Sequence, residues 1–464
     1  MAYMDLFDEK AKALACRCLD YYDGRSKEHL IKFLQTYRKY ALGKGLIPRT
    51  RNLTKKIADK SGLLFNGKPP MVEVYPVDDA PSPDDALSAQ LHELFESARW
   101  VEFFSNFDPT VRLLKTAWVL VQYAPEKDRW VMDTMTQANA AVSVDLFGDL
   151  EVLLYETGKV DDYRTFKVWT PLEVFDLYVD KAGNEEKRDA LPNPYGVIPA
   201  AVFYDTNVPR SGAWNPIPED LIEVNDMYNL HITDSEYTAS WNKQPTLFTN
   251  AQIQGGTGTQ YVEKQVYGEP LPRWVPSSAP GFVGGPGTVV GIETNGEQVY
   301  LEYKKPDVDL MPLDDIMSKW VADYADDWSV NIKLDGQGSA ADSGFKLVVE
   351  ELPNLELRKA RQRMFEAGFE RLFEVIKNVG AYHGVTFPPE AVVDVTFSTP
   401  DLPVDEKASE EVWSIRISEG RASRVDYFMA TKGLSLEEAE AKVAEIDAYG
   451  DKPAPVAPPI TPVV

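Results

Sequence analysis

Hydrophobic residues recur at helical spacing near the start of the chain and at strand-like spacing further on. Leu14, Cys18 and Tyr22 lie four residues apart within residues 5–45, which predicts helices there. Between about residues 115 and 205 the apolar runs become short and are separated by Gly, Asp and Lys turns. That pattern is typical of β-strands, so this stretch is predicted to form sheet.

A second strong helical pattern begins near residue 82. Ser82 is a good N-cap, Pro83 suits the first helical position, and the aspartates that follow favour the first turn. The apolar stripe then runs on through Ala98 and Val101. We therefore expect one helix that begins here and continues past both residues.

Helical patterns dominate the second half of the chain. Residues 217–243 and 311–328 each carry an apolar stripe, and a glycine-rich stretch with short β runs separates them. A longer pattern spans residues 344–380, with an apolar stripe that includes Ala360. We expect Pro353 to kink or interrupt this helix. Helical and strand segments do not alternate regularly, so the predicted class is α+β rather than a doubly wound α/β sheet.

The charge of the chain restricts its partners. Its 464 residues, 44% of them hydrophobic, include 48 Lys and Arg against 73 Asp and Glu, so the net charge is 48 − 73 = −25. A protein that grips nucleic acid non-specifically is usually basic, because its affinity comes from neutralised phosphates. This chain should repel DNA over most of its surface, which still allows DNA as a partner that moves past without sticking.

Neither a membrane protein nor a secreted protein is predicted. The N-terminal sequence MAYMDLFDEK lacks the apolar region of a signal peptide, and the longest apolar stretch, TAWVLVQYA, is far shorter than a membrane span. Cys16 and Cys18 lie on one predicted helix, which allows no disulfide framework. Together with His29 they still lack a fourth metal ligand, so we expect helix packing there. The expectation is a soluble intracellular protein without metal or cofactor.

One stretch has the spacing of a nucleotide-binding loop. In KLDGQGSAADSGFK the residues Gly336, Gly338 and Ala341 fit G-x-G-x-x-G/A. That fingerprint works only where the following helix returns promptly to a second parallel strand, whereas about forty residues of helical pattern follow here. The Walker A spacing fails as well, and no histidine lies near a nucleophile motif. No enzyme is predicted, and a nucleotide-binding enzyme that uses Gly336 and Gly338 remains an alternative.

Several local phrases, in their order along the chain, carry a resemblance to a known family. The phrases are YYDGRSKEHL, NLTKKIADKSGLLFNGKPP, YGVIPAAVFYDT with DLIEVNDMYNLHITDSEY after it, and VTFSTPDLPVDEKASEEVWSIRISEGRASRVDYFMATKGLSLEEAEAKVAEI. In this order they resemble the portal proteins of tailed bacteriophages. The match covers most of residues 10–450, and KLDGQGSAADSGFK occupies the place of the loop and helix start of that family.

The resemblance implies a portal-type ring subunit of the α+β class. Its expected parts are an N-terminal wing (1–210), a first stem helix (211–243), a β-rich clip (244–310), a second stem helix (311–328), a tunnel loop (329–343), a long wing helix with a strand (344–400), a helical crown (401–450) and a proline-rich tail (451–464).

The resemblance also implies a function and partners. Portal proteins form a ring at one capsid vertex, through which double-stranded DNA is packaged and ejected. We therefore expect a homo-oligomeric ring of about 12 copies in the virion, assembled in the host cytoplasm. The implied partners are double-stranded DNA, the large terminase, a head–tail adaptor at the clip, and the major capsid and scaffold proteins, with no membrane. Another head–tail connector or structural ring protein without a packaging role is the alternative.

Four aspartates of the second stem helix are candidates for the channel wall. They are Asp315, Asp323, Asp326 and Asp327. Repeated around a ring, such carboxylates would repel phosphates and prevent the multivalent binding that stalls a moving duplex. The same aspartates could equally face solvent or neighbouring subunits, and the sequence leaves both readings open.

The glycine-rich loop is the second candidate for contact with DNA. Lys333 is its only basic residue, and one lysine per subunit is expected to touch phosphates weakly and non-specifically. Asn331 and Ser339 are expected to add neutral hydrogen bonds, while Gly336 and Gly338 make the loop flexible.

Overall fold

The computed structural model describes most of the chain and divides it into two compact units. The described residues are 3–38, 46–65, 68–78, 80–145, 148–210, 212–242, 246–249, 252–254, 291–293, 301–304, 311–330, 344–398, 413–418, 421–432 and 436–450. The first unit comprises Met1–Gly336 and Pro353–Thr399, and the second comprises Gln337–Leu352 and Pro400–Val464.

Antiparallel strand pairs form the β part of the fold. The strands are β1 (Met71–Tyr75), β2 (Thr116–Ala124), β3 (Arg129–Met135), β4 (Ala140–Val144), β5 (Leu150–Val160), β6 (Tyr163–Trp169), β7 (Glu173–Val179), β8 (Glu185–Pro192), β9 (Ala200–Tyr204), β10 (Thr246–Thr249), β11 (Gln252–Gln254), β12 (Gly291–Glu293), β13 (Leu301–Lys304) and β14 (Val392–Thr396). One sheet has the order β3-β2-β9, a second has the order β4-β5-β6-β7-β8, and β1 pairs with β14. The predicted sheet between residues 115 and 205 is confirmed.

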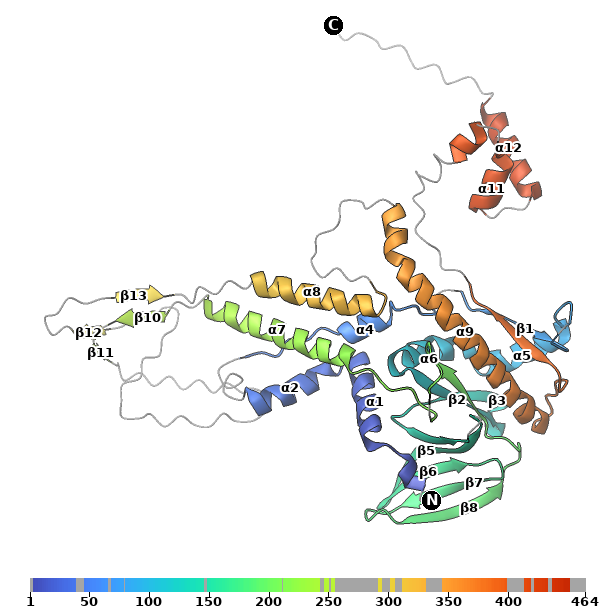
Figure 1. The fold of residues 1–464 in the computed structure, drawn as a ribbon, viewed down its shortest axis with the longest axis horizontal. Helices are drawn as coiled ribbons and strands as arrows, with labels where there is room; N and C mark the ends of the chain where they lie inside the picture. Colours follow the sequence, from blue (N-terminus) through green and yellow to red (C-terminus); the bar gives the residue numbers. More distant parts are fainter. Residues whose placement is uncertain are drawn as a thin grey trace, which may run out of the picture. The chain divides into compact units, whose positions relative to one another are not determined.

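Helices form the α part of the described structure (Figure 1). They are η1 (Tyr3–Leu6), α1 (Glu9–Tyr22), α2 (Ser26–Tyr37), α4 (Leu53–Ala58), α5 (Asp85–Ser97), α6 (Trp100–Leu114), η2 (Pro125–Lys127), α7 (Asp220–Asn242), α8 (Met311–Asp327), α9 (Gly344–Tyr382), α11 (Arg424–Lys432) and α12 (Leu436–Gly450). All strand pairs in the described structure are antiparallel, and β2 to β9 follow one another without an α-helix between them, so the α+β class is confirmed.

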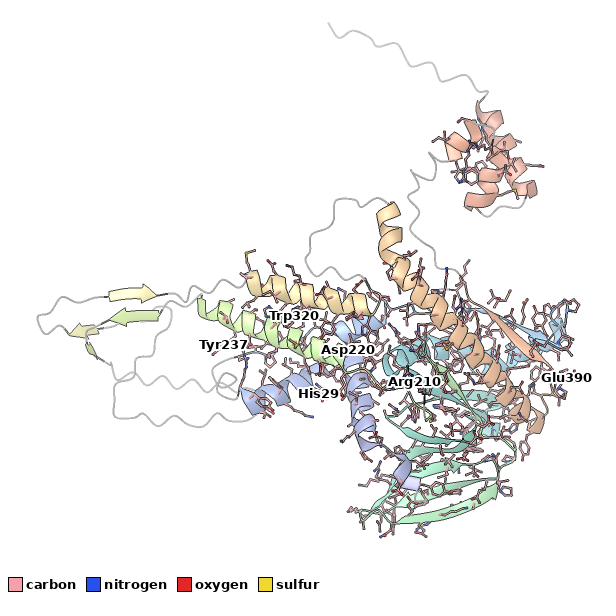
Figure 2. The ribbon with its side chains drawn as sticks, in the orientation of Figure 1. His29, Arg210, Asp220, Tyr237, Trp320 and Glu390 are labelled. Atoms are coloured by element: carbon pink, nitrogen blue, oxygen red, sulfur yellow. The ribbon has the colours of Figure 1, made fainter. Side chains whose placement is uncertain are left out.

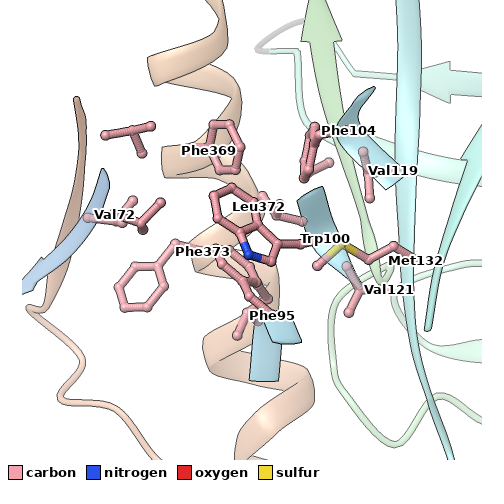
Figure 3. Packing of buried hydrophobic residues seen from close by; sticks show 14 of the residues in the cluster. Val72, Phe95, Trp100, Phe104, Val119, Val121, Met132, Phe369, Leu372 and Phe373 are labelled. Carbon is pink, nitrogen blue, oxygen red and sulfur yellow. The ribbon is translucent and has the colours of Figure 1, made fainter. Parts of the chain in front are cut away.

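Helices cover one face of the three-stranded sheet. Val119 of β2 meets Phe104 of α6 and Phe369 of α9 in the largest apolar cluster (Figure 3). Gly368 lets α9 approach the sheet closely, because a Cβ at this position would overlap the ring of Phe203 on β9. The sheet therefore fixes where the long helix α9 lies.

The other face of this sheet packs against the five-stranded sheet. Trp118 and Leu120 of β2 join Leu153 and Trp169 of the second sheet in one cluster. Because both faces of β2 are covered, its first six residues are all buried and do not alternate with polar ones. The far face of the five-stranded sheet is covered by the N-terminal segment, where Phe7 is buried.

Two details of the helix expected from residue 82 are wrong. The N-cap is Asp84, whose carboxylate accepts from the backbone N–H groups of Ala86 and Leu87, so Ser82 lies outside the helix. The helix also ends at Ser97, because Arg99 adopts a left-handed conformation with φ 53° and a new helix, α6, follows.

The long helix also differs from its prediction. Pro353 lies inside α9, which continues from Gly344 to Tyr382, so the expected interruption is wrong, while the expected kink stays a prediction. Ala360, expected on the buried stripe, is exposed, and Arg361 is fully buried instead.

The region between α7 and α8 in the sequence contains short strand pairs. β10 pairs with β13, and β11 pairs with β12, as expected for a β-rich stretch. The predicted run QYVEKQVY lies outside the described residues. In the second unit α11 packs against α12. Among the helices the structure describes, none has the length and apolar character that crossing a bilayer requires.

Candidate functional site

Helices α7 and α8 pack side by side (Figure 1). Val224 of α7 and Val321 of α8 share a buried cluster with Leu53 of α4. His231 Nε2 of α7 lies 2.7 Å from Asp314 Oδ1 of α8, which adds a polar link between the two helices. The pair is therefore one structural element rather than two independent helices.

The four aspartates predicted for the channel wall lie together on the outward face of α8. Asp315, Asp323, Asp326 and Asp327 are all exposed. Successive helix residues are about 100° apart, so the four fall within a sector about 120° wide, centred opposite the buried Val321. Within the described ranges none of the four side chains forms an ion pair.

Several carboxylates of α7, unlike the four aspartates of α8, form ion pairs within the described structure. Three of them pair with arginines from the N-terminal part of the chain: Asp226 with Arg17, Asp234 with Arg38, and Glu236 with Arg49. These pairs are partly exposed, so solvent screens them and they contribute little to stability. Their larger effect is on charge, because they neutralise part of α7 while the outward face of α8 stays negative.

An extended segment is hydrogen-bonded along α7. The bonds run from the backbone N–H groups of Arg49, Arg51 and Leu53 to Thr233 Oγ1, Asn229 Oδ1 and Asn225 Oδ1, at 2.9, 2.7 and 2.7 Å. Four residues of α7 span about 6 Å, and two residues of the extended segment span about 6.6 Å. Because these lengths are similar, every second N–H group of the segment lies beside a side chain of the adjacent turn of α7. This register positions α4 against α7.

A buried ion-pair cluster lies where α8 ends. Asp205, the residue after β9, accepts from Arg112 of α6 at 2.6 Å and from Lys115 at 3.0 Å. Arg361 of α9 donates to the other oxygen of the same carboxylate at 2.7 Å. Asp205 and Arg361 are almost completely buried, so their charges depend on one another for stabilisation.

The same cluster holds the loop that follows α4. Arg361 donates to the carbonyl of Gly62 at 2.7 Å and to the carboxylate of Asp108 on α6. Asp108 in turn accepts from the backbone N–H groups of Leu64 and Phe65. One guanidinium and one carboxylate therefore tie α6, α9 and this loop together.

The end of α8 is attached to the ion-pair cluster as well. The carbonyl of Trp328 accepts from the Ser61 hydroxyl at 2.7 Å. Arg112 and Lys115 lie over the Trp328 ring, 4.5 and 4.2 Å from its centroid. Val330, the last described residue before the glycine-rich loop, is buried. The cluster therefore fixes the point from which that loop departs.

The electrostatics of the cluster favour its ionised form at neutral pH. Burial alone would raise the pKa of Asp205, but Arg112, Arg361 and Lys115 outweigh it and lower this pKa to about 2. Burial lowers the pKa of Lys115 to about 8, although Asp205 opposes the shift. Burial also acts to lower the pKa of Arg361, but Asp108 and Asp205 outweigh it, so that pKa is raised.

The residues of the glycine-rich loop that were predicted to contact DNA are not among those that the structure describes. Asn331, Lys333, Gly336, Gly338 and Ser339 lie outside the described residues. Their contact with DNA stays a prediction.

Sequence reasoning missed the ion-pair cluster, although a signal for it is present. Arg361 lies four residues before the buried Phe365 on α9, and Asp108 lies three residues before the buried Val111 on α6. Charged residues of opposite sign at apolar stripe positions indicate pairing, since unpaired charges are almost never buried. The sequence does not say that these two helices meet.

Metal chemistry finds no support in the parts of the chain that the structure describes. No group of three or more His, Cys, Asp or Glu side chains is placed there to hold an ion. Cys18 is buried, and burial raises the pKa of its thiol to about 12, so it acts as a packing residue of α1. Cys16 is exposed.

Comparisons with known proteins give only distant likenesses. No family model matches the chain, and no curated protein matches it. A chain in the virion of a native gene transfer agent particle aligns with 11% identity and a TM-score of 0.41, covering 88% of this chain and 93% of that one. A chain in the neck of an empty gene transfer agent particle, computed with C6 symmetry, aligns with 11% identity and a TM-score of 0.43, covering 86% and 92%. TM-scores this low do not establish a shared fold.

Proposed function

We propose that the chain is a portal subunit, of which about 12 copies form a ring at one capsid vertex. Double-stranded DNA passes through the channel of this ring during packaging and ejection. The ordered phrases over residues 10–450 motivate the proposal. The observation that carries it is the outward face of α8, where four exposed carboxylates share one sector without ion-pair partners among the described residues.

A duplex that passes through the channel must not bind to the channel wall. A single acidic helix face repels phosphates only weakly, because salt screens exposed charges over about 8–10 Å. Repetition of that face around a closed ring adds the potentials, so phosphates on every side of the duplex meet the same repulsion. An acidic wall therefore suits a passage better than a binding site.

The partners follow from the same proposal. Residues 244–310 form the clip, which meets the large terminase during packaging and a head–tail adaptor afterwards. Residues 401–450 form the crown, and the major capsid and scaffold proteins surround the ring at its vertex. The assembled protein is a virion component that acts without catalysis and without a cofactor.

Electron microscopy of the purified full-length chain tests the assembly. We expect rings with a central channel and a mass of about 625 kDa, that is about 12 times 52.1 kDa. A protein that stays monomeric or dimeric at micromolar concentration would contradict the proposal.

Charge reversal on α8 tests the role of the acidic face. In Asp315→Lys/Asp326→Lys the ring should form and retain double-stranded DNA, with an affinity that falls steeply as salt rises. Asp315→Asn/Asp326→Asn should retain DNA more weakly, and Glu93→Lys/Glu126→Lys, at exposed sites on α5 and η2, should behave as wild type. Equal DNA retention by all three rings would favour the alternative, a structural ring without a packaging role.

The loop has its own test. Lys333→Glu should lower the yield of packaged DNA in a terminase-driven reaction while leaving ring assembly intact, because it removes the single phosphate contact expected per subunit. Unchanged packaging would rule out this role for Lys333.

A further inference from the structure

An apolar strip is exposed along one flank of the α7–α8 pair. Leu313, Ile316 and Trp320 of α8 are 49%, 47% and 45% exposed, and Met227 of α7 is 43% exposed. Trp320 lies on α8 beside α7 (Figure 2). Large apolar side chains gathered at one place on a surface mark an interaction site.

The strip borders a groove with an acidic edge. The groove has a volume of about 290 Å³ and lies between Val224 and Met227 of α7 and Trp320 and Asp323 of α8. Glu223 precedes Val224 on α7 and is exposed. Neither Glu223 nor Asp323 forms an ion pair with any part of the chain that the structure describes. An occupant of this groove therefore needs positive charge together with aliphatic surface, which the stems of lysine and arginine side chains supply.

The opposite flank of the helix pair is basic. The extended segment bound by Asn229 lies there, because Asn229 and Met227 are two residues apart on α7 and point about 160° away from each other. This basic segment, residues 49–60, has the sequence RTRNLTKKIADK, with five cations and one carboxylate. Its Lys56 and Lys60 are exposed, and neither forms an ion pair within the described ranges.

We propose that the acidic groove of one copy receives the basic segment of the neighbouring copy. This inference rests on the proposed ring. A closed ring needs two different, complementary surfaces on each subunit, and opposite flanks of one helix pair supply them. The free charges match, since Lys56 and Lys60 of the basic segment and Glu223 and Asp323 at the groove are all exposed and form no ion pair within the described ranges.

The two kinds of surface have separate roles in this contact. Burial of the strip that contains Trp320 supplies the driving force, because removal of apolar area from water is the main favourable term in association. The charges set the register and exclude the wrong orientation, since two acidic grooves facing each other would repel. Of the four aspartates on the outward face of α8, Asp323 then belongs to the subunit contact, whereas Asp315 and Asp326 lie on the side away from the groove and remain free to face a channel.

Complementary charge reversal tests the contact in the full-length chain. The groove variant Glu223→Lys/Asp323→Lys and the segment variant Lys56→Glu/Lys60→Glu should each lose rings, with at least a tenfold lower ring fraction at a concentration where wild type is assembled. An equimolar mixture of the two variants should recover rings in which they alternate. In that mixture each reversed groove meets a reversed segment and each native groove meets a native one, so recovery also shows that both variants are folded.

The outcomes separate this contact from the ring itself. The matched control Glu93→Lys/Glu126→Lys should assemble as wild type does. If the wild-type chain forms no ring, the proposed function fails and the contact fails with it. If wild type forms rings and either variant assembles equally well, or if the mixture recovers nothing, the ring stands and the groove belongs to another partner.

Discussion

Replacement of Asp205 by asparagine removes the charge on which three cations converge, the buried Arg112 and Arg361 and the partly buried Lys115. The carboxylate accepts from Arg112, Lys115 and Arg361, and asparagine keeps its shape and one acceptor oxygen. Since the pKa of Asp205 falls from 3.8 to about 2 on folding, the folded protein favours the ionised form over the neutral one by about 2 kcal/mol more than the unfolded chain does. Breaking a buried pair by removing one partner costs about 3–5 kcal/mol. We therefore expect a loss of about 2–5 kcal/mol at pH 7.

The pH dependence identifies the cause of that loss. A carboxyl whose folded pKa is depressed contributes stability above its unfolded pKa, near 3.8, and this contribution disappears as the pH falls toward 2. Wild type should therefore lose this part of its stability between about pH 4 and pH 2, whereas Asp205→Asn should not. About half of the pKa-linked difference should be gone by pH 3.

Urea unfolding of both proteins, followed at pH 7, 5, 4 and 3, measures the difference in unfolding free energy. Amide hydrogen exchange of α9 at pH 7 locates the effect, because Arg361 should be released there. Asp394→Asn, at an exposed position on β14, is the matched control and should change stability by no more than about 0.5 kcal/mol. A loss below about 1 kcal/mol at pH 7, or a difference that stays constant down to pH 3, would refute the electrostatic reasoning.

Three further substitutions test the packing that places α7 and α9. Gly368→Ala inserts a Cβ into the ring of Phe203 and should cost about 1–3 kcal/mol in thermal unfolding; an unchanged melting temperature would mean that α9 lies further from the sheet. Phe369→Ala leaves a cavity in the largest core cluster and should cost about 3–5 kcal/mol in urea unfolding, and a cost below 1 kcal/mol would contradict its burial. Asn229→Ala leaves the N–H of Arg51 without its acceptor and should cost about 1–3 kcal/mol, with faster amide exchange at that residue; unchanged exchange would argue against the bond.

The spacing of apolar residues predicts much of the local structure. The helical period alone places the four aspartates in one sector of α8, because they belong to one uninterrupted helix, and the burial of Val321 in the structure shows that this sector faces outward. The strands between residues 115 and 205 follow in the same way from short runs and turn residues. The spacing of apolar residues does not predict where one helix ends and the next begins. At Arg99 a single residue in the left-handed conformation divides an apparently continuous apolar stripe into α5 and α6.

The sequence by itself determined the elements, the excess negative charge and the sector of α8 that carries it. Only the tertiary structure decided which charges are neutralised. Asp108 and Arg361 lie 253 residues apart, and their pairing depends on α6 and α9 packing against the same sheet. The same holds for the arginines that neutralise carboxylates of α7, which come from helices and loops far away in the sequence. Periodicity fixes the face on which a side chain lies, but its electrostatic environment depends on what the fold brings against that face.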